Sequence, residues 1–198
     1  MTSRAATFHP AIVVHGGCGR WTNVDTARAL KSVRAAVRAA RCVFAQGGSA
    51  LDAVCAAVVL LEDDPLFNAG TGSVLNGDGE AEMDACVMTG EELRCGAVAA
   101  LKNVKNPILV ARRVMEVTPH VLLAGAGALA FARRERLECP RDLRVEASTS
   151  ARSSPGTVGA VALDAKGRLA AATSTGGIRG KLPGRVGDSP IPGAGNYA

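Results

Sequence analysis

The segment GTVGAVALDAKGRLAAATSTGGIRGKLPGRVGDSPIPGAGNYA, residues 156–198, carries the clearest signal of fold class in the chain. Its first part predicts two strands around a turn at DAKG, and its remainder is a glycine- and proline-rich loop. The preceding residues, about 138–156, are polar, aperiodic and rich in Ser, Arg and Pro, which predicts a flexible linker. Thr157 therefore stands where a linker ends and a buried strand begins.

This position suits a nucleophile. Cleavage of the Gly156–Thr157 peptide bond would free an α-amine with a pKa of about 8, which could take the proton of the Thr157 hydroxyl at neutral pH. Gly156 leaves room for that hydroxyl to attack the preceding carbonyl, and it tolerates a strained backbone. The competing interpretation is an ordinary turn-to-strand junction, which is what most Gly-Thr pairs are.

Residues downstream of Thr157 add a second part of a site. The second predicted strand ends in Thr173, Ser174 and Thr175, which lie beside the strand of Thr157 if the two strands form a hairpin. Arg185 and Asp188 share one glycine-bounded loop. An Arg can hold a carboxylate through paired hydrogen bonds and an Asp can hold an ammonium group, so together they could bind a free amino-acid end. A surface ion pair between the two residues explains them equally well.

The upstream sequence predicts helices and strands in separate runs. We expect a short buried strand in PAIVVHGG, residues 10–17, and helices over 25–46 and from Ser49 as N-cap through 50–64. Further strands are predicted near 73–75, 81–88 and 95–100, with turns such as NGDG between them. A helix begins at Asn106-Pro107, is broken by Pro119, and is followed by another. This order predicts an α+β fold in which helical layers cover an antiparallel or mixed sheet.

Composition narrows the class of protein. The net charge is +5, but the arginine clusters at 112–113 and 133–136 fall in predicted helices without interleaved aromatic residues, so we expect solvated helix faces and no nucleic-acid partner. The six cysteines form no CxxC pair and mostly lie in apolar runs, which predicts buried thiols in a reducing compartment. No signal-peptide or membrane-spanning stretch is evident. We therefore expect a cytoplasmic protein with no membrane partner.

Residues 156–198 closely resemble the plant-type L-asparaginase/isoaspartyl peptidase family of N-terminal nucleophile hydrolases. The upstream runs VVHGG, GGSALDAV, LEDDPLFNAGTGSVLN, EMDACVM, GAVAAL and NPILVARRVME resemble the same family in the same order. The likeness is greatest to its animal, asparaginase-like branch and covers nearly the whole chain.

This resemblance implies an αββα sandwich that cleaves itself before Thr157 into units 1–156 and 157–198. Thr157 would then attack the side-chain amide of L-asparagine or the β-linked bond of an isoaspartyl dipeptide. By the same resemblance Thr175 hydrogen-bonds the nucleophile, Asn68 lies near the scissile bond, and Arg185 and Asp188 bind the substrate. Members are usually homodimers of cleaved units and require no cofactor.

Two backbone segments also carry over from the family. The turn His15, Gly16 and Gly17 matches a glycine-rich loop linked to self-cleavage at Gly156–Thr157. The run LEDDPLFNAGT matches a loop whose backbone carbonyls hold a monovalent cation, usually sodium. The six matching residues are Leu61, Glu62, Asp64, Phe67, Ala69 and Thr71. Free carbonyls after a helix C-terminus are ligands that suit a hard cation.

The chain departs from the family pattern in two places. The linker before Thr157 is shorter, and the sequence stops at GAGNYA. The family continues with further strands, helices and a Thr-Gly pair that forms the oxyanion hole, so we expect a sandwich incomplete at its C-terminus. Loss of one oxyanion donor costs roughly a hundred- to a thousand-fold in rate. A truncated, catalytically inactive isoform or fragment is therefore the main alternative, ahead of a glycosylasparaginase or a threonine endopeptidase.

Overall fold

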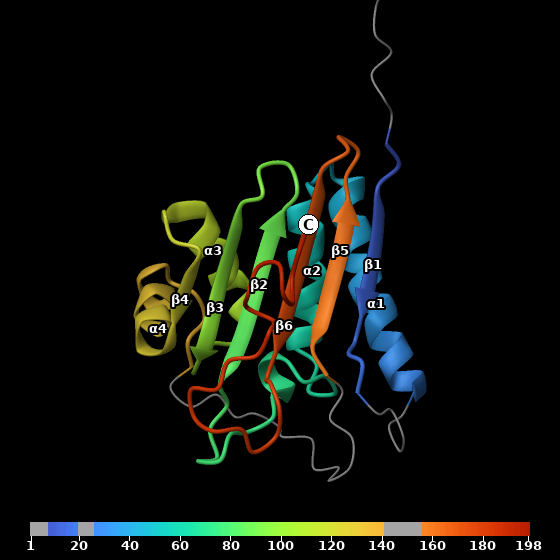
Figure 1. The fold of residues 1–198 in the computed structure, drawn as a ribbon. Helices are drawn as coiled ribbons and strands as arrows, with labels where there is room; N and C mark the ends of the chain where they lie inside the picture. Colours follow the sequence, from blue (N-terminus) through green and yellow to red (C-terminus); the bar gives the residue numbers. More distant parts are fainter. Residues whose placement is uncertain (1–7, 20–25, 141–155) are drawn as a thin grey trace, which may run out of the picture.

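The computed structural model describes residues 8–19, 26–140 and 156–198. They form a six-stranded sheet in the order β1-β5-β6-β2-β3-β4 (Figure 1). Its strands are β1 Ala11–His15, β2 Met83–Thr89, β3 Cys95–Leu101, β4 Leu122–Ala124, β5 Val158–Leu163 and β6 Leu169–Thr175. Every neighbouring pair is antiparallel except β3 and β4, so the predicted α+β class with a mixed sheet is confirmed.

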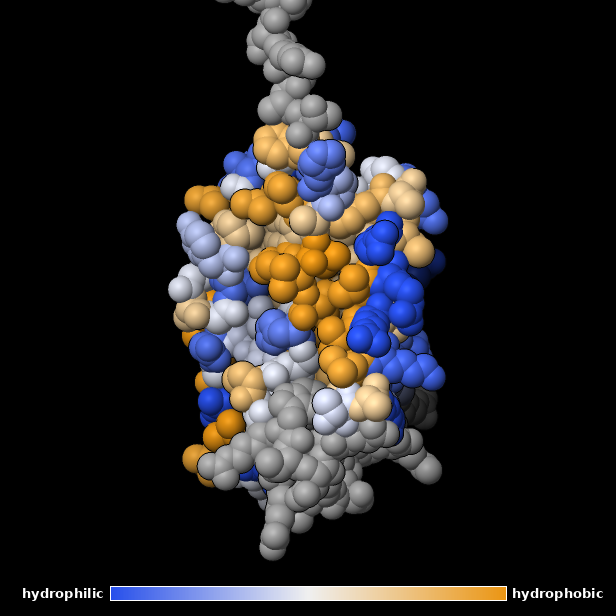
Figure 2. Space-filling view, turned by 90° about the vertical axis from the view of Figure 1, so that its right-hand side faces the viewer, coloured by the Kyte–Doolittle hydropathy of each residue, from blue (hydrophilic) through white to orange (hydrophobic). Residues whose placement is uncertain are grey.

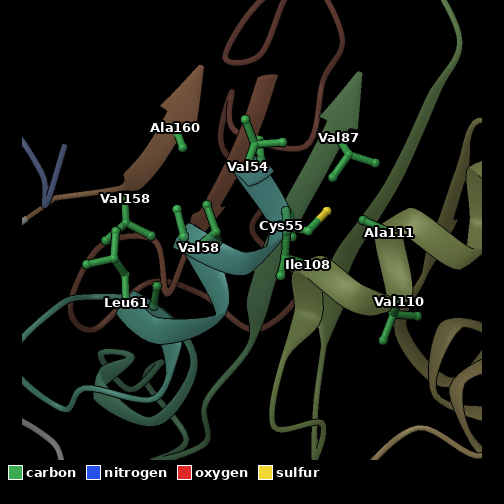
Figure 3. Packing of buried hydrophobic residues seen from close by; sticks show 14 of the residues in the cluster. Val54, Cys55, Val58, Leu61, Val87, Ile108, Val110, Ala111, Val158 and Ala160 are labelled. Carbon is green, nitrogen blue, oxygen red and sulfur yellow. The ribbon is translucent and has the colours of Figure 1, made fainter. Parts of the chain in front are cut away.

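The helices cover one face of this sheet. They are α1 Thr26–Ala45, α2 Ala50–Glu62, α3 Pro107–Val117 and α4 Gly125–Arg134, and a short 3-10 helix, η1, spans Gly70–Gly72. Helices α2 and α3 bring Val58 and Ile108 against Val158 of β5 and Val87 of β2 (Figure 3). Most of this core is Ala and Val, and such small side chains let helix and sheet backbones approach closely.

Local sequence signals place two of these helices. Ser49 caps α2 by accepting the Asp52 amide, and the Asp52 carboxylate accepts the Ser49 amide in return. Pro107 occupies the first turn of α3, where its missing N–H costs nothing. Both helix starts were predicted from the sequence and are confirmed.

The opposite face of the sheet carries the C-terminal segment. Residues 176–198 cross in front of β6 and β2, away from the helices (Figure 1). Thr173 donates to Asn196 Oδ1 at 2.9 Å, and the Asn196 amide donates to the sulfur of Cys86 at 3.4 Å, so both strands hold the end of the segment. This segment leaves the β1 side open: Val13 is 67% exposed, and apolar surface gathers on that side (Figure 2).

Three strands differ from the prediction. The strand at 11–15 is not buried but lies at the edge of the sheet, paired only with β5 and alternately exposed. Residues 73–75 form no strand, because after η1 only Leu75 bridges to Ala81 across the NGDG turn. The three-residue β4, which pairs in parallel with β3 and leads into α4, was not predicted because it is too short to show alternation.

Predictions about thiols and charges hold only in part. Cys55 and Cys86 are buried as expected, but the other two of these four thiols are exposed. Cys18 follows the turn after β1, and Cys42 faces outward on α1. Arg133 and Arg134 are exposed on α4 as expected, whereas Arg112 is half-buried and pairs with Asp52 of α2 at 2.6 Å. None of the described helices combines the length and apolarity needed to cross a bilayer.

The predicted linker lies mostly outside the described residues, at 141–155. Its first residue, Glu138, lies within the described residues and accepts the Lys105 amide at 3.1 Å through its backbone carbonyl. Its last, Gly156, is placed against the turn after β1. Both ends of the segment are therefore fixed to the folded body.

Candidate active site

Thr157 precedes β5 on the face of the sheet away from the helices. Val158 pairs with Ser174, so the next position in the same antiparallel register sets Thr157 opposite Thr175. The Thr157 hydroxyl lies 3.3 Å from the hydroxyl of Ser189, whose side chain is buried. The predicted nucleophile and its predicted neighbour on β6 are thus brought together, and Ser189 is the hydroxyl that the structure places in contact with Thr157.

The backbone before Thr157 is packed against the turn after β1. A Cβ atom built on Gly17 would lie 2.5 Å from the Gly156 carbonyl oxygen and 2.7 Å from the Gly156 nitrogen. The Gly17 φ of 114° also lies in the region that favours glycine. Only glycine at position 17 therefore permits this contact with the peptide unit that precedes Thr157.

The other two residues of the turn are also in tight contact. The His15 ring covers Gly159 of β5, where a built Cβ would lie 2.5 Å from His15 Nε2. Burial lowers the pKa of His15, which favours the neutral ring at this position. Gly16 lies against the ring of Phe67, with 2.4 Å between its built Cβ and the nearest ring carbon. The turn 15–17 therefore contacts both Phe67, in the predicted cation-binding loop, and the start of β5.

Asn68 and Thr175 shape the exit from β6. The Asn68 side-chain amide donates to the Gly177 carbonyl at 2.7 Å, while the Asn68 backbone carbonyl accepts the Gly176 amide at 2.9 Å. The Thr175 hydroxyl accepts the Gly177 amide at 3.0 Å, which leaves its proton available for another acceptor. Asn68 therefore fixes the turn directly after Thr175.

Arg185 and Asp188 lie on the loop that follows. The Arg185 guanidinium lies beside Gly177 and Gly187, whose built Cβ atoms would be 3.3 Å and 3.0 Å from Nη1. The ion pairs among the described residues do not include one between Arg185 and Asp188, so the surface ion-pair interpretation is wrong. The Asp188 side chain is exposed, and its neighbour Ser189 reaches Thr157.

The predicted cation loop follows the C-terminus of α2. Pro65 has no amide to donate to the Leu61 carbonyl, so that carbonyl is left for another partner. The carbonyls of Asp64, Phe67 and Ala69 accept amides within the loop at 2.9–3.2 Å, and each retains a second lone pair. The arrangement fits a cation held by backbone oxygens, and the sodium site stays a prediction.

Sequence reasoning missed three side chains that shape the site. Ser189 stood next to Asp188 in GDSP but was not chosen. Glu82 and Asp84 are carboxylates inside the apolar run EMDACVM, and both are buried. A charged residue within an apolar strand is a signal of a buried partner, and it could have marked both carboxylates.

Known proteins are similar to nearly the whole chain. The asparaginase family matches residues 8–149 and 141–198 of the chain. The chain belongs to the asparaginase family. The match spans both the helical layer and the segment that carries Thr157, Thr175 and Arg185.

Individual members of the asparaginase family are similar along nearly the whole chain. The isoaspartyl peptidase/L-asparaginase of Homo sapiens is 48% identical over 211 residues, covering 96% of this chain and 68% of the relative. The protein of the same name from Bos taurus is 47% identical with the same coverage. The isoaspartyl peptidase of Escherichia coli K12 is 46% identical, covering 94% of this chain and 67% of the relative.

Proposed function

We propose that this protein is an N-terminal threonine amidohydrolase. It cleaves itself between Gly156 and Thr157 and then hydrolyses L-asparagine to aspartate and ammonia, and β-linked isoaspartyl dipeptides to their two amino acids. Family membership and the names of the relatives support the reaction class. The observation that carries the proposal is the placement of Thr157 before β5, with the Gly156 peptide unit against Gly17 on one side and Ser189 on the other.

Self-cleavage begins with attack by the Thr157 hydroxyl oxygen on the Gly156 carbonyl carbon. The peptide C–N bond breaks as the acyl group passes to oxygen, and the nitrogen takes the hydroxyl proton to become an amine. Water then hydrolyses the ester, leaving a Gly156 carboxylate and a free Thr157 amine. Close packing of Gly156 on Gly17 limits the orientations of the scissile peptide, which is how a positioned reactant gains rate.

Turnover uses the same hydroxyl with a new base. The Thr157 amine takes the hydroxyl proton as the oxygen attacks the substrate amide carbon, and ammonia or the leaving amino acid departs with that proton. Water then hydrolyses the β-aspartyl ester. Arg185 is suited to the substrate α-carboxylate and Asp188 to its α-ammonium group. Thr175 lies opposite Thr157 when the Val158–Ser174 register is extended by one position, and the Ser189 hydroxyl lies 3.3 Å from the reacting oxygen.

The proposal includes the assembly of the working enzyme. Residues 1–156 and 157–198 form the two units after cleavage, held together by pairing of β5 with β1 and of β6 with β2. A sodium ion on the carbonyls of the loop after α2, a homodimer of cleaved units and a cytoplasmic location complete it. All six cysteines are free thiols, which supports a reducing compartment.

A denaturing gel tests self-cleavage directly. Incubation of the purified chain should convert it to fragments 1–156 and 157–198, and ammonia release from L-asparagine should appear with the fragments. Thr157→Ala should abolish both, whereas Thr157→Ser keeps a hydroxyl and should retain partial cleavage. A single band of the uncleaved chain after long incubation, even with added glycine, contradicts the proposal and favours the inactive alternative.

A further inference from the structure

The loop that carries Arg185 is tied to β2 and the residues before it. We call residues 176–188 the clamp loop. The Gly180 amide donates to the Leu75 carbonyl at 2.9 Å, and the Lys181 carbonyl accepts the Gly77 amide at 2.8 Å. The buried Lys181 ammonium donates to the Glu82 carbonyl at 2.6 Å. The first half of the clamp loop is thus held by backbone contacts to residues 75–82.

Two side chains hold the second half, on either side of Arg185. The Gly184 amide donates to Glu82 Oε2 at 2.8 Å, and the Gly187 amide donates to Asp84 Oδ2 at 3.3 Å. Residues two apart on an extended chain point to the same side, so Glu82 and Asp84 reach the same loop. The two carboxylates thus bind backbone amides one residue before Arg185 and two residues after it.

Both carboxylates are themselves held in place. Asp84 is fully buried, and its Oδ1 accepts the Ala100 amide at 2.9 Å at a point where the β2–β3 register shifts. Glu82 is 4% exposed, and its Oε1 lies 3.4 Å from the Lys102 ammonium. The second oxygen of each carboxylate is the one offered to the clamp loop. Each carboxylate is therefore held on the sheet side by one oxygen and binds an amide of the clamp loop with the other.

The cations that act most strongly on the two carboxylates differ. The cations that act on Asp84 are Lys181 and Arg185. Lys102 and the Gly184 amide outweigh burial at Glu82 and hold its pKa below the ordinary value. Arg185 has no ion pair of its own among the described residues, so its guanidinium keeps its donors for a ligand.

We propose that Glu82 and Asp84 are positioning residues, which fix the Arg185 guanidinium for the substrate α-carboxylate by binding the Gly184 and Gly187 amides. The inference rests on the proposed function, because it assigns Arg185 to the carboxylate of that substrate. A loop containing four glycines between 177 and 187 loses much conformational freedom on ordering, so anchors supplied in advance favour ligand binding. Their loss should weaken binding of the carboxylate more than it slows the chemical step.

The test compares two amides that differ only in the α-carboxylate, namely L-asparagine and 3-aminopropanamide. Asp84→Asn and Glu82→Gln should each raise KM for L-asparagine roughly tenfold, the effect of one charge-assisted hydrogen bond, with kcat changed less than about threefold. KM for 3-aminopropanamide should stay the same. Asp164→Asn is the matched control, because Asp164 is an equally buried carboxylate that binds the Ala50 amide far from the clamp loop.

Binding of the product L-aspartate, measured by calorimetry, decides the inference even without turnover. Both variants should bind it roughly tenfold more weakly than the unaltered chain and the Asp164→Asn control do, and hydrogen exchange at Gly184 and Gly187 should speed up. L-aspartate affinities within twofold of the control, with exchange unchanged, overturn the positioning role. Absence of ammonia release from the unaltered chain counts against the proposed function alone. Glu82→Gln alters the Gly184 hydrogen bond and the Lys102 ion pair but leaves Asp84 and its Ala100 contact intact, so it serves if Asp84→Asn does not fold.

Discussion

Two fully buried carboxylates flank the end of β6, and their surroundings differ on the two faces of the sheet. Glu62 lies on the helix side, where Oε1 accepts the Ser174 hydroxyl at 2.6 Å and the Ile108 amide at 3.0 Å. Its Oε2 has no partner among the described residues. Asp84 lies on the loop side, where both oxygens accept amides and two cations are near. The same functional group is thus built into two opposite environments.

The difference shows what each carboxylate is suited to do. Burial raises the pKa of Glu62 to about 8 despite the Ser174 and Ile108 hydrogen bonds, so it is mainly protonated at neutral pH and acts as a neutral link between α2, α3 and β6. Burial also raises the pKa of Asp84, but two amides and the cations Lys181 and Arg185 oppose that rise. Burial thus raises the pKa of both carboxylates, and the cations that oppose the rise act on the loop side.

The largest effect is expected at Asp84. Asp84→Ala leaves the Ala100 and Gly187 amides without an acceptor and removes a buried negative charge from Lys181. A buried donor left without an acceptor costs about 1–3 kcal/mol, so the two amides predict a loss of about 2–6 kcal/mol in the free energy of unfolding. Urea denaturation measures it. A loss below about 1 kcal/mol would mean that Asp84 carries little charge in the folded chain and that the comparison is unsound.

An intermediate effect is expected from Glu62 as pH changes. Its folded-state pKa of about 8 lies above the ordinary 4.5, so the folded chain keeps a proton that the unfolded chain releases. Its contribution to stability is full below about pH 4.5 and falls until about pH 8, by up to ~1.4 kcal/mol per pH unit. Glu62→Gln should remove this slope, so the variant gains stability relative to the unaltered chain from pH 5 to pH 8. Parallel urea midpoints at the two pH values would show that Glu62 is not protonated.

The smallest effect is expected at Ser174. Ser174→Ala removes one hydrogen bond to Glu62, which keeps the Ile108 amide as a donor. A hydrogen bond between neutral groups contributes about 1 kcal/mol, and thermal unfolding at pH 6 measures the difference. A loss as large as that of Asp84→Ala would indicate an ionised Glu62. The loss of stability should therefore be clearly larger for Asp84→Ala, on one face of the sheet, than for Ser174→Ala, on the other.

The sequence sufficed where local pattern and local chemistry agree. Ser49 and Pro107 mark helix starts through caps that act within one turn, and the run around DAKG alternates clearly enough to define β5 and β6. The choice of Thr157, Thr175 and Arg185 came from spacing and resemblance, and the structure places them at one end of one face.

The remainder depends on contacts between distant residues. Nothing near Ser189 in sequence indicates that its hydroxyl meets Thr157, which is 32 positions earlier. Glu82 and Gly184 are 102 positions apart, so no local pattern could reveal the anchor of the clamp loop. The edge position of β1 is likewise set by strand order, because AIVVH reads alike in a central or an edge strand.

The fit of Gly17 against Gly156 has a consequence for timing. The two residues touch only when β1 has paired with β5, which joins the first strand of the chain to the fifth. Under the proposed function, the scissile bond packs against Gly17 late in folding, after the residues on both sides of the bond have been synthesised and assembled. A chain in which β1 has not paired with β5 lacks that packing contact and is not cleaved. Self-cleavage then acts as a checkpoint, releasing the reactive amine only in molecules that have folded.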